Sequence, residues 1–220
     1  MIVLCWHRFG PYHHARARAA ATQLDLVGLE ISTIDHTNRW EPVAVTAGFS
    51  KITLCPEKSI DDLSLDELRA AIDRVLSRIA PTAIAIHGYS SRSALGILEW
   101  ALRRRCPTIL MSESNAFDSV RRTWGEYIKS RIVGLYSAGL VGGTNAAEYL
   151  IQLGMPRKSV FVGYDVIDNE HFARQRIFDV AAGALMYLTN RFFLASARFI
   201  EKKNLSFLLN VFATYKKLAG

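Results

Sequence analysis

The stretch from Thr82-Ala-Ile-Ala-Ile86 through His87-Gly88 to Pro107-Thr-Ile-Leu-Met111 carries the pattern that decides the fold. Two continuously apolar runs flank residues 91–105, where Leu95, Leu98 and Leu102 recur at helical spacing and predict one buried helix face. Strands that are apolar throughout and separated by helices are typical of a parallel sheet covered on both faces. The stretch therefore predicts a β-α-β unit of an α/β fold.

The same alternation continues in both directions along the chain. Glu67 stands three residues after Ser64, which is the capping-box spacing and predicts a helix from Ser64 to about Ile79, before Pro81. Gly154 is expected to close a later helix in the C′ position. The remaining predicted strands are 2–6, 29–34, 49–54, 140–143 and 160–162, and the remaining predicted helices are 15–26, 119–133 and 145–153. The sequence thus predicts a parallel sheet of at least six strands within residues 1 to about 165.

The composition sets limits on the class of protein. The chain has 220 residues, half of them hydrophobic, and no apolar run reaches the roughly 18 residues of a membrane span. Cys5, Cys55 and Cys106 are widely spaced and lie in or beside apolar runs, so we expect buried free thiols in a reducing compartment. We therefore expect a cytoplasmic protein, with no secretory signal at Met1.

The formal net charge is +7, and the cations are clustered at Arg103–Arg105, Arg121–Arg122, Lys129, Arg131 and Lys202–Lys203. Two interpretations stay open. The favoured one is that the clusters are solvated helix faces and helix ends, and the other is that they form a surface that lies on anionic lipid at the inner face of a membrane. No zinc-finger spacing, RNA-binding signature or interleaving of basic and aromatic residues favours a nucleic-acid partner.

In a parallel sheet the ligand site lies at the carboxyl ends of the strands. Polar residues or glycines follow the predicted strands at 7–10, 87–88, 113–115, 142–144 and 163–165. We therefore expect His87 and Glu113 to lie at the same edge of the sheet. The sequence contains no P-loop, GxGxxG or Ser-His-Asp order, which argues against an NTPase, a dinucleotide-binding enzyme or a serine hydrolase.

A second unit is predicted near the C-terminus. An apolar run from Phe192 to Ala195 reads as a strand that leads to Arg198, a turn carries Lys202 and Lys203, and Leu205, Leu208, Leu209 and Phe212 recur at helical spacing. A strand, a turn with cations and a helix form a place to hold an anionic group. We predict a first Rossmann-like domain at 1–176, a linker at 177–189, and at 190–220 the first βα unit of a second Rossmann-like domain that is cut short.

Three segments resemble retaining glycosyltransferases of the GT-B fold, of the family-four type: Ala197-Arg-Phe-Ile-Glu-Lys-Lys-Asn-Leu205, Gly163-Tyr-Asp-Val-Ile-Asp-Asn-Glu-His-Phe172 and the first loop, Phe9-Gly-Pro-Tyr12. The resemblance implies two Rossmann-like domains, the first for the acceptor and the second for a nucleotide sugar. Two features depart from the family. Its Glu-x7-Glu region is absent, and the first loop has Gly10-Pro11 in place of a Gly-Gly pair.

The resemblance also implies roles for individual residues. Arg198 and Lys203 would hold the donor diphosphate and stabilise its charge as it leaves. This is the favoured interpretation in the context of the motif, and the alternative is that both are exposed turn cations. His87 would contact the donor sugar and the reacting centre as the catalytic residue. Glu113 would bind acceptor hydroxyls or cap a helix.

The first loop, Gly10, Pro11, Tyr12 and His13, is assigned to the acceptor or the cleft. For His13 and His14 the favoured interpretation is an exposed helix N-terminus, with acceptor or phosphate contact as the alternative.

The function implied is transfer of a hexose, with retention, from a nucleotide diphosphate sugar to a glycan, glycolipid or small acceptor. No cofactor and no metal ligand is predicted, because the nucleotide sugar is a substrate. We expect the chain by itself to lack full activity. Two alternatives remain: another GT-B enzyme such as a sugar-nucleotide epimerase, or a non-catalytic carbohydrate-binding domain. Donor, acceptor and oligomeric state stay open.

Overall fold

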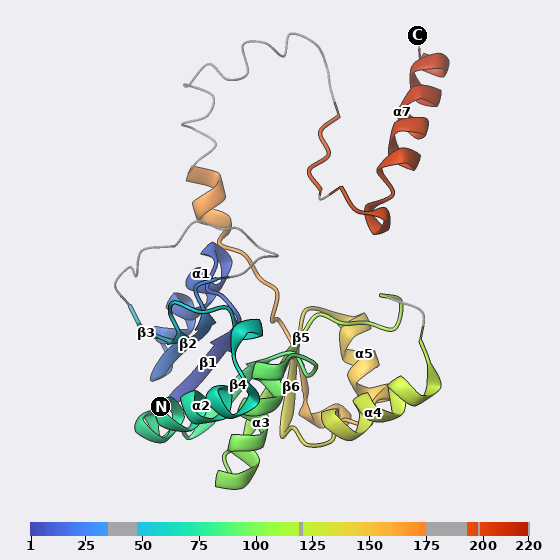
Figure 1. Ribbon diagram of the computed structural model, residues 1–220. Coiled ribbons are helices and arrows are strands. Elements are labelled where there is room, and N and C mark those ends of the chain that lie inside the picture. The colour runs from blue at the N-terminus through green and yellow to red at the C-terminus, as the bar shows by residue number, and fades with distance from the viewer. Residues whose placement is uncertain (35–47, 119–120, 175–192, 198, 220) are drawn as a thin grey trace. The chain divides into compact units, whose positions relative to one another are not determined.

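The computed structural model describes residues 1–34, 48–118, 121–174, 193–197 and 199–219 (Figure 1). Its contacts divide the chain into two compact units, Met1–Asn169 and Glu170–Gly220. Each unit is described by itself below. The predicted linker at 177–189 lies outside the described residues.

The first unit contains a seven-stranded sheet in which every pair of neighbouring strands is parallel. The strand order is β3-β2-β1-β4-β5-β6-β7, so the chain builds outward from β1 in one direction and then in the other. The α/β Rossmann-like fold predicted from the apolar runs is confirmed. The strands are β1 Ile2–Trp6, β2 Leu26–Ser32, β3 Ser50–Cys55, β4 Ala83–His87, β5 Thr108–Ser112, β6 Ala138–Val141 and β7 Val160–Val162.

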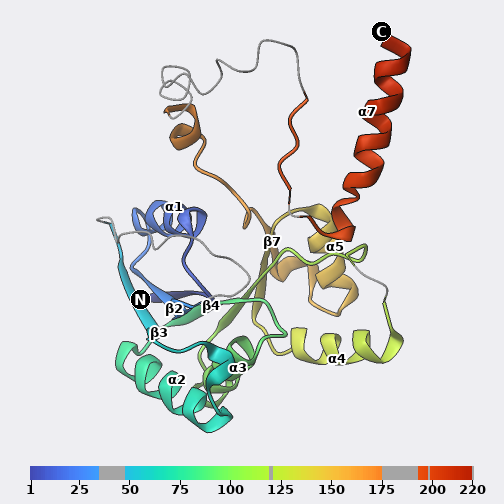
Figure 2. The same ribbon diagram turned by 45° about the horizontal axis from the view of Figure 1, so that its top comes forward.

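Helices cover both faces of this sheet (Figures 1 and 2). On β4, Ile84 and Ile86 belong to the larger hydrophobic cluster, while Ala85 between them belongs to the smaller one. Because successive strand residues point to opposite faces, the two clusters lie on opposite sides of the sheet. The helices are α1 Pro11–Ala21, α2 Leu65–Ile79, α3 Arg92–Arg104, α4 Thr123–Val133 and α5 Thr144–Gln152.

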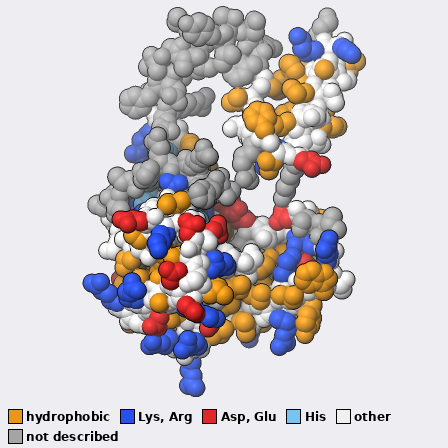
Figure 3. Space-filling model, viewed as in Figure 1, with side chains coloured by type: hydrophobic (Ala, Val, Ile, Leu, Met, Phe, Trp, Pro, Cys, Tyr) orange, Lys and Arg blue, Asp and Glu red, His pale blue; other side chains and the backbone are white. Residues whose placement is uncertain are grey.

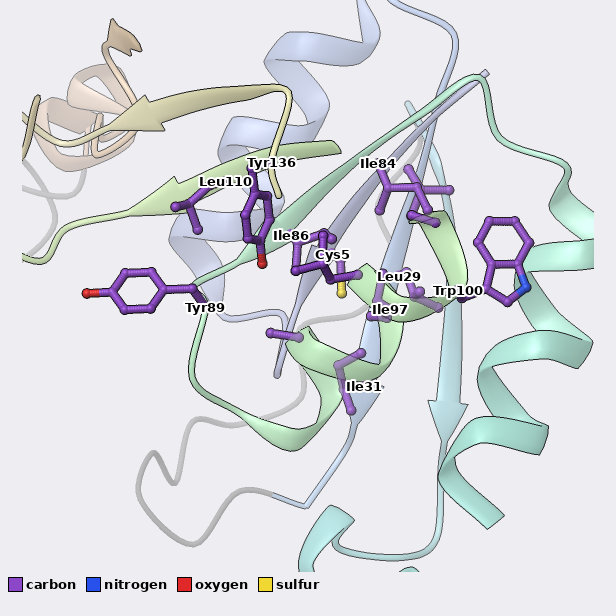
Figure 4. Packing of buried hydrophobic residues seen from close by; sticks show 14 of the residues in the cluster. Cys5, Leu29, Ile31, Ile84, Ile86, Tyr89, Ile97, Trp100, Leu110 and Tyr136 are labelled. Carbon is purple, nitrogen blue, oxygen red and sulfur yellow. The ribbon is translucent and has the colours of Figure 1, made fainter. Parts of the chain in front are cut away.

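The larger cluster packs α2, α3 and α5 on the sheet, and Figure 4 shows its centre around Cys5, Ile86 and Ile97. The smaller cluster packs Ala17 of α1 against Trp6 and Phe9. Cys5 and Cys55 are free and buried as predicted, whereas Cys106 is partly exposed.

The capping box predicted for α2 is present. The Ser64 hydroxyl accepts from the Glu67 backbone N–H at 3.2 Å, and the Glu67 carboxylate accepts from the Ser64 backbone N–H at 2.8 Å. Two helix donors that have no intrahelical partner are thereby satisfied.

The predicted buried face of α3 is partly wrong. Leu98 is buried, but Leu95 and Leu102 are 37% and 44% exposed, and Ala94, Ile97 and Ala101 are buried instead. Gly96 lies where α3 meets α2, since a Cβ there would lie 2.8 Å from Ile72 Cδ1. The buried side of α3 is thus centred on Ala94, Ile97, Leu98 and Ala101.

Two N-terminal elements begin earlier than predicted. Pro11 occupies the first turn of α1, where its lost N–H and its restricted φ are tolerated, so the helix starts there instead of at residue 15. The second strand starts at Leu26 instead of Leu29 and includes Glu30 within a fully buried run. The Glu30 carboxylate accepts hydrogen bonds from three donors: the Phe9 backbone N–H at 2.9 Å, Lys51 Nζ at 2.8 Å and Thr53 Oγ1 at 2.9 Å.

In the second unit a 3₁₀ turn, Glu201–Lys203, precedes the helix α7, Leu205–Ala219. The helix was predicted, but the strand was not found, because residues 193–197 are not in a strand and residue 192 lies outside the described part of the chain. A strand needs a paired neighbour for its backbone hydrogen bonds. Phe193 packs instead against Phe212 and Tyr215 of α7, with ring centroids 6.0 and 5.5 Å apart. Among the described residues, no helix is long and apolar enough to cross a membrane.

Candidate functional site

A cavity of about 370 Å³ opens at the carboxyl edge of the sheet, where β4 and β5 end. His87, the last residue of β4, and Glu113, the first residue after β5, both line it, as the order of parallel strands predicts. The size falls within the range of small-molecule sites. The other lining residues are Gly88, Met111, Ser112, Ser114, Asp118 and Tyr164.

The His87 ring is held on both sides by polar side chains. Its Nδ1 lies 3.4 Å from Cys5 Sγ, and its Nε2 lies 3.3 Å from Ser93 Oγ and 3.4 Å from Ser91 Oγ. Burial lowers the pKa of His87 to about 4, and the positive potential of His7 and His13 adds to the effect. His87 is therefore a neutral, oriented imidazole near neutral pH, suited to hydrogen bonding and not to carrying a charge.

Acidic side chains give the cavity its electrostatic character. Glu113 and Asp118 line it, and burial followed by the nearby charge of Asp165 raises the pKa of Glu113 above its usual range, against the opposing effect of Arg16. A Cβ on Gly142 would lie 3.3 Å from Asp165 Cβ and 3.5 Å from Glu113 Cγ, so the glycine lies close to both acidic side chains. Such a lining favours hydroxyl or cationic groups over phosphates.

The segment after β7 returns across the carboxyl edge to α1, at the opposite side of the strand order (Figure 1). Tyr164 accepts a 2.9 Å hydrogen bond from Trp6 Nε1. Arg16 forms an ion pair with Asp165 and donates to the Val166 carbonyl at 2.8 Å. The crossing segment thus closes one side of the cavity. Sequence reasoning named residues 163–165 as strand-end residues but assigned Tyr164 and Asp165 no place in the site, because their partners lie about 150 positions away.

The first loop meets the same edge. The Gly10 backbone N–H donates to His13 Nδ1 at 3.1 Å, and the His13 ring packs on Trp6 with centroids 4.9 Å apart. Pro11 begins α1, and Tyr12 is 41% exposed.

The favoured interpretation of the histidine pair as an exposed helix N-terminus is wrong. His13 is half-buried and His14 is only 5% exposed. The reason is that α1 begins at Pro11, which turns the ring of His14 toward Phe9 and Phe49, at centroid distances of 5.4 and 5.7 Å.

A polar network holds the loop that follows β5. Arg121 donates to the backbone carbonyls of Asn115 and Ala116, and its Nη1 lies 2.9 Å from the Tyr149 hydroxyl on α5. The Tyr149 hydroxyl donates to Glu126 at 2.8 Å. Arg121 therefore holds the loop that carries Glu113 and Asp118 and ties it to α4 and α5.

The predicted donor-side cations belong to the second unit. Lys203 is exposed at the end of the 3₁₀ turn, and its backbone N–H donates to the Ile200 carbonyl at 2.9 Å. Residue 198 lies outside the described residues, so the diphosphate role of Arg198 and Lys203 stays a prediction. Within the described part of the chain, no three His, Cys, Asp or Glu side chains gather as metal ligands would.

The first unit is a Rossmann-like α/β domain with an acidic cavity at the carboxyl edge of its sheet. The sequence matches no protein-family model and no curated protein. Solved structures do match. UDP-N-acetylglucosamine 2-epimerase from Rickettsia bellii is 14% identical with a TM-score of 0.52, covering 86% of this chain and 51% of that chain.

Two further structures match to the same degree. UDP-GlcNAc 2-epimerase from Neisseria meningitidis bound to UDP-GlcNAc is 14% identical, with a TM-score of 0.51 over 87% of this chain and 54% of that one. Anabaena Alr3699/HepE in complex with UDP and glucose is 11% identical, with a TM-score of 0.51 over 83% of this chain and 50% of that one. The chain spans about half the length of these proteins. At these identities the likeness establishes the fold, an α/β Rossmann-like domain of the kind found in GT-B proteins.

Proposed function

We propose that the chain is the acceptor-side part of a sugar-nucleotide enzyme, specifically a retaining glycosyltransferase that moves a hexose from a nucleotide diphosphate sugar to a hydroxyl-bearing acceptor. The observation that carries the proposal is the cavity at the carboxyl edge, in which a neutral His87 and the carboxylates of Glu113 and Asp118 face one space. Carboxylates accept hydrogen bonds from sugar hydroxyls, and a neutral imidazole can donate or accept one. The fold similarity to proteins whose structures contain UDP or UDP-GlcNAc supports the same class of substrate.

The acidic lining of the cavity suits the hydroxyl-bearing acceptor better than the diphosphate of the donor. A diphosphate would be repelled by Glu113 and Asp118, so the phosphates belong on cations elsewhere, and Arg198 and Lys203 are the candidates. Residues 190–220 would then be the start of a nucleotide-sugar-binding domain. In the reaction these two cations would stabilise the charge that builds on the leaving diphosphate, His87 would contact the transferring sugar, and Glu113 would orient the acceptor hydroxyl.

Kinetics on the full-length product of the coding sequence, with a panel of nucleotide sugars and acceptors, test the proposal. Arg198→Ala and Lys203→Ala should each lower kcat by roughly 10²–10³, the usual loss for one preorganised donor to a developing anion. His87→Ala should lower kcat by about 10–10³. Glu113→Gln should raise the KM for the acceptor more than that for the donor. Arg103→Ala, which removes an exposed cation at the end of α3, is the control and should leave all constants unchanged.

The identity of the product separates the candidate activities. A new glycosidic bond with the anomeric configuration of the donor, read by NMR, supports retaining transfer. A sugar nucleotide inverted at one carbon without any acceptor would show an epimerase instead. Unchanged turnover in both Arg198→Ala and Lys203→Ala would refute the phosphate roles, and glycan binding without turnover would show a carbohydrate-binding domain.

A further inference from the structure

Helix α4 carries an apolar face that points away from the rest of the first unit. Trp124, Tyr127 and Ile128 are 65%, 68% and 47% exposed, and they stand at i, i+3 and i+4 on one side of the helix. Arg131 continues the same side at i+7, and Leu135, just beyond the helix, is 48% exposed. Figure 3 shows hydrophobic side chains gathered there beside Lys and Arg side chains. This amphipathic surface is called the α4 face below.

The opposite side of the helix already has its partners. Val133 is fully buried in the larger hydrophobic cluster, and Lys129 and Glu126 form a 2.7 Å ion pair that contacts the Tyr149 hydroxyl. These contacts hold α4 on the domain without using the α4 face. Three large apolar side chains left exposed on one short helix indicate a surface for a partner.

The charges around the α4 face indicate an anionic partner. Residues 121–137 contain four cations, Arg121, Arg122, Lys129 and Arg131, and one acid, Glu126, which gives the segment a net charge of +4 − 1 = +3. Arg121 and Lys129 pair with Glu126 on the opposite side of the helix, so Arg122 and Arg131 are the cations that remain for the α4 face. Glu126 is held 3.7 Å from Arg121 in addition to its pair with Lys129. Arg122, the N-cap residue of α4, and Arg131, one turn after Ile128, are both exposed.

We propose that the α4 face binds the surface of an anionic lipid bilayer, with Trp124, Tyr127 and Ile128 at headgroup depth and Arg122 and Arg131 against lipid phosphates. Indole and phenol rings have an apolar body and a polar tip, which suits the boundary between headgroups and acyl chains. A helix with an apolar stripe and cations at its edge lies in the plane of that boundary. The helix lies at the outer side of the sheet in both ribbon views, so a flat surface can reach it (Figures 1 and 2). The inference goes beyond the proposed activity and does not depend on it.

Co-sedimentation of the full chain with vesicles tests the proposal. Vesicles of four parts phosphatidylcholine to one part phosphatidylglycerol should bind the protein, and pure phosphatidylcholine vesicles should bind it far more weakly. Arg131→Gln should weaken partitioning about fivefold, the equivalent of the roughly 1 kcal/mol that a cation contributes near an anionic surface. Trp124→Ser should weaken it about tenfold or more, since an apolar ring no longer leaves water. Arg103→Gln, an exposed cation on α3, is the matched control and should bind as the parent does.

A second readout locates the contact. Brominated lipids in the same vesicles should quench tryptophan emission, and Trp124→Phe should keep most of the binding while losing most of the quenching. All substituted side chains are exposed, so circular dichroism should report an unchanged fold.

Three results would overturn the proposal. One is equal binding to both kinds of vesicle. Another is parental binding by Trp124→Ser together with loss of binding in Phe207→Ser and Leu209→Ser, which would place the contact on the exposed apolar residues of α7. The third is a self-association seen by sedimentation velocity that Trp124→Ser abolishes, because a second copy would then cover the α4 face.

Discussion

Acidification should destabilise the first unit through the histidines at its site edge. Burial lowers the pKa of His87 from 6.5 to about 4, and it lowers the pKa of His13 to about 4 as well. The folded-state pKa therefore lies below the unfolded one, and between pH 6.5 and 4 the unfolded chain binds more protons than the folded chain. Stability that is fully present above pH 6.5 is lost as the pH falls through this window.

The magnitude follows from the shift. A histidine whose pKa falls from 6.5 to about 4 on folding takes roughly 2 kcal/mol from stability at pH 5 and about 3 kcal/mol at pH 4. Urea unfolding of the parent and of His87→Gln at pH 7 and pH 5 measures this directly. The parent should lose about 2 kcal/mol more than the variant between the two pH values, while carboxylates elsewhere contribute equally to both.

His171→Gln is the matched control, since it removes an exposed histidine of the second unit, and its loss of stability between pH 7 and pH 5 should equal that of the parent. An equal loss in the parent and in His87→Gln would refute the reasoning, because it would mean that His87 is solvated enough to be protonated in the folded protein.

Two further substitutions test the interior. Glu30→Ala leaves Lys51 partly buried without its carboxylate and should cost about 3–5 kcal/mol, seen as a Tm lower by roughly 10 °C. Glu99→Ala, which breaks an exposed pair with Arg69, should change the Tm by no more than a few degrees, and equal effects would contradict the importance of burial. Leu76→Ala opens a cavity under α2 and should cost about 2–5 kcal/mol in urea unfolding, whereas Leu65→Ala, at a 55% exposed position of the same helix, should stay within about 0.5 kcal/mol. A Leu76→Ala protein as stable as the parent would show that α2 does not hold the core.

The local sequence pattern was enough to predict most helices and strands of the first unit and their order along the chain. The runs at 83–86 and 109–111 are apolar at every position and alternate with helical patterns, which is typical of strands covered on both faces, so a parallel sheet was predicted without any contact being known. The Ser64 and Glu67 spacing predicted the start of α2 for an equally local reason, since a cap is formed within one turn. Because all parallel strands end at one edge, the sequence also placed His87 and Glu113 together.

Tertiary structure decided whatever depends on partners distant in sequence. Glu30 interrupts an apolar run, and only the donors supplied by Phe9, Lys51 and Thr53 make its burial possible. The face that α3 buries is set by how it packs against the sheet and α2, which helical periodicity does not contain.

The site shows the same division. Chain order put residues 163–165 after the last strand, but the return of that segment across the sheet, which joins Tyr164 to Trp6 and Asp165 to Arg16, is a property of the folded chain. Periodicity records which side of an element is buried, because burial repeats with the geometry of the element. It does not record which residue from a distant part of the sequence contacts that side, because such contacts form only when the elements pack together.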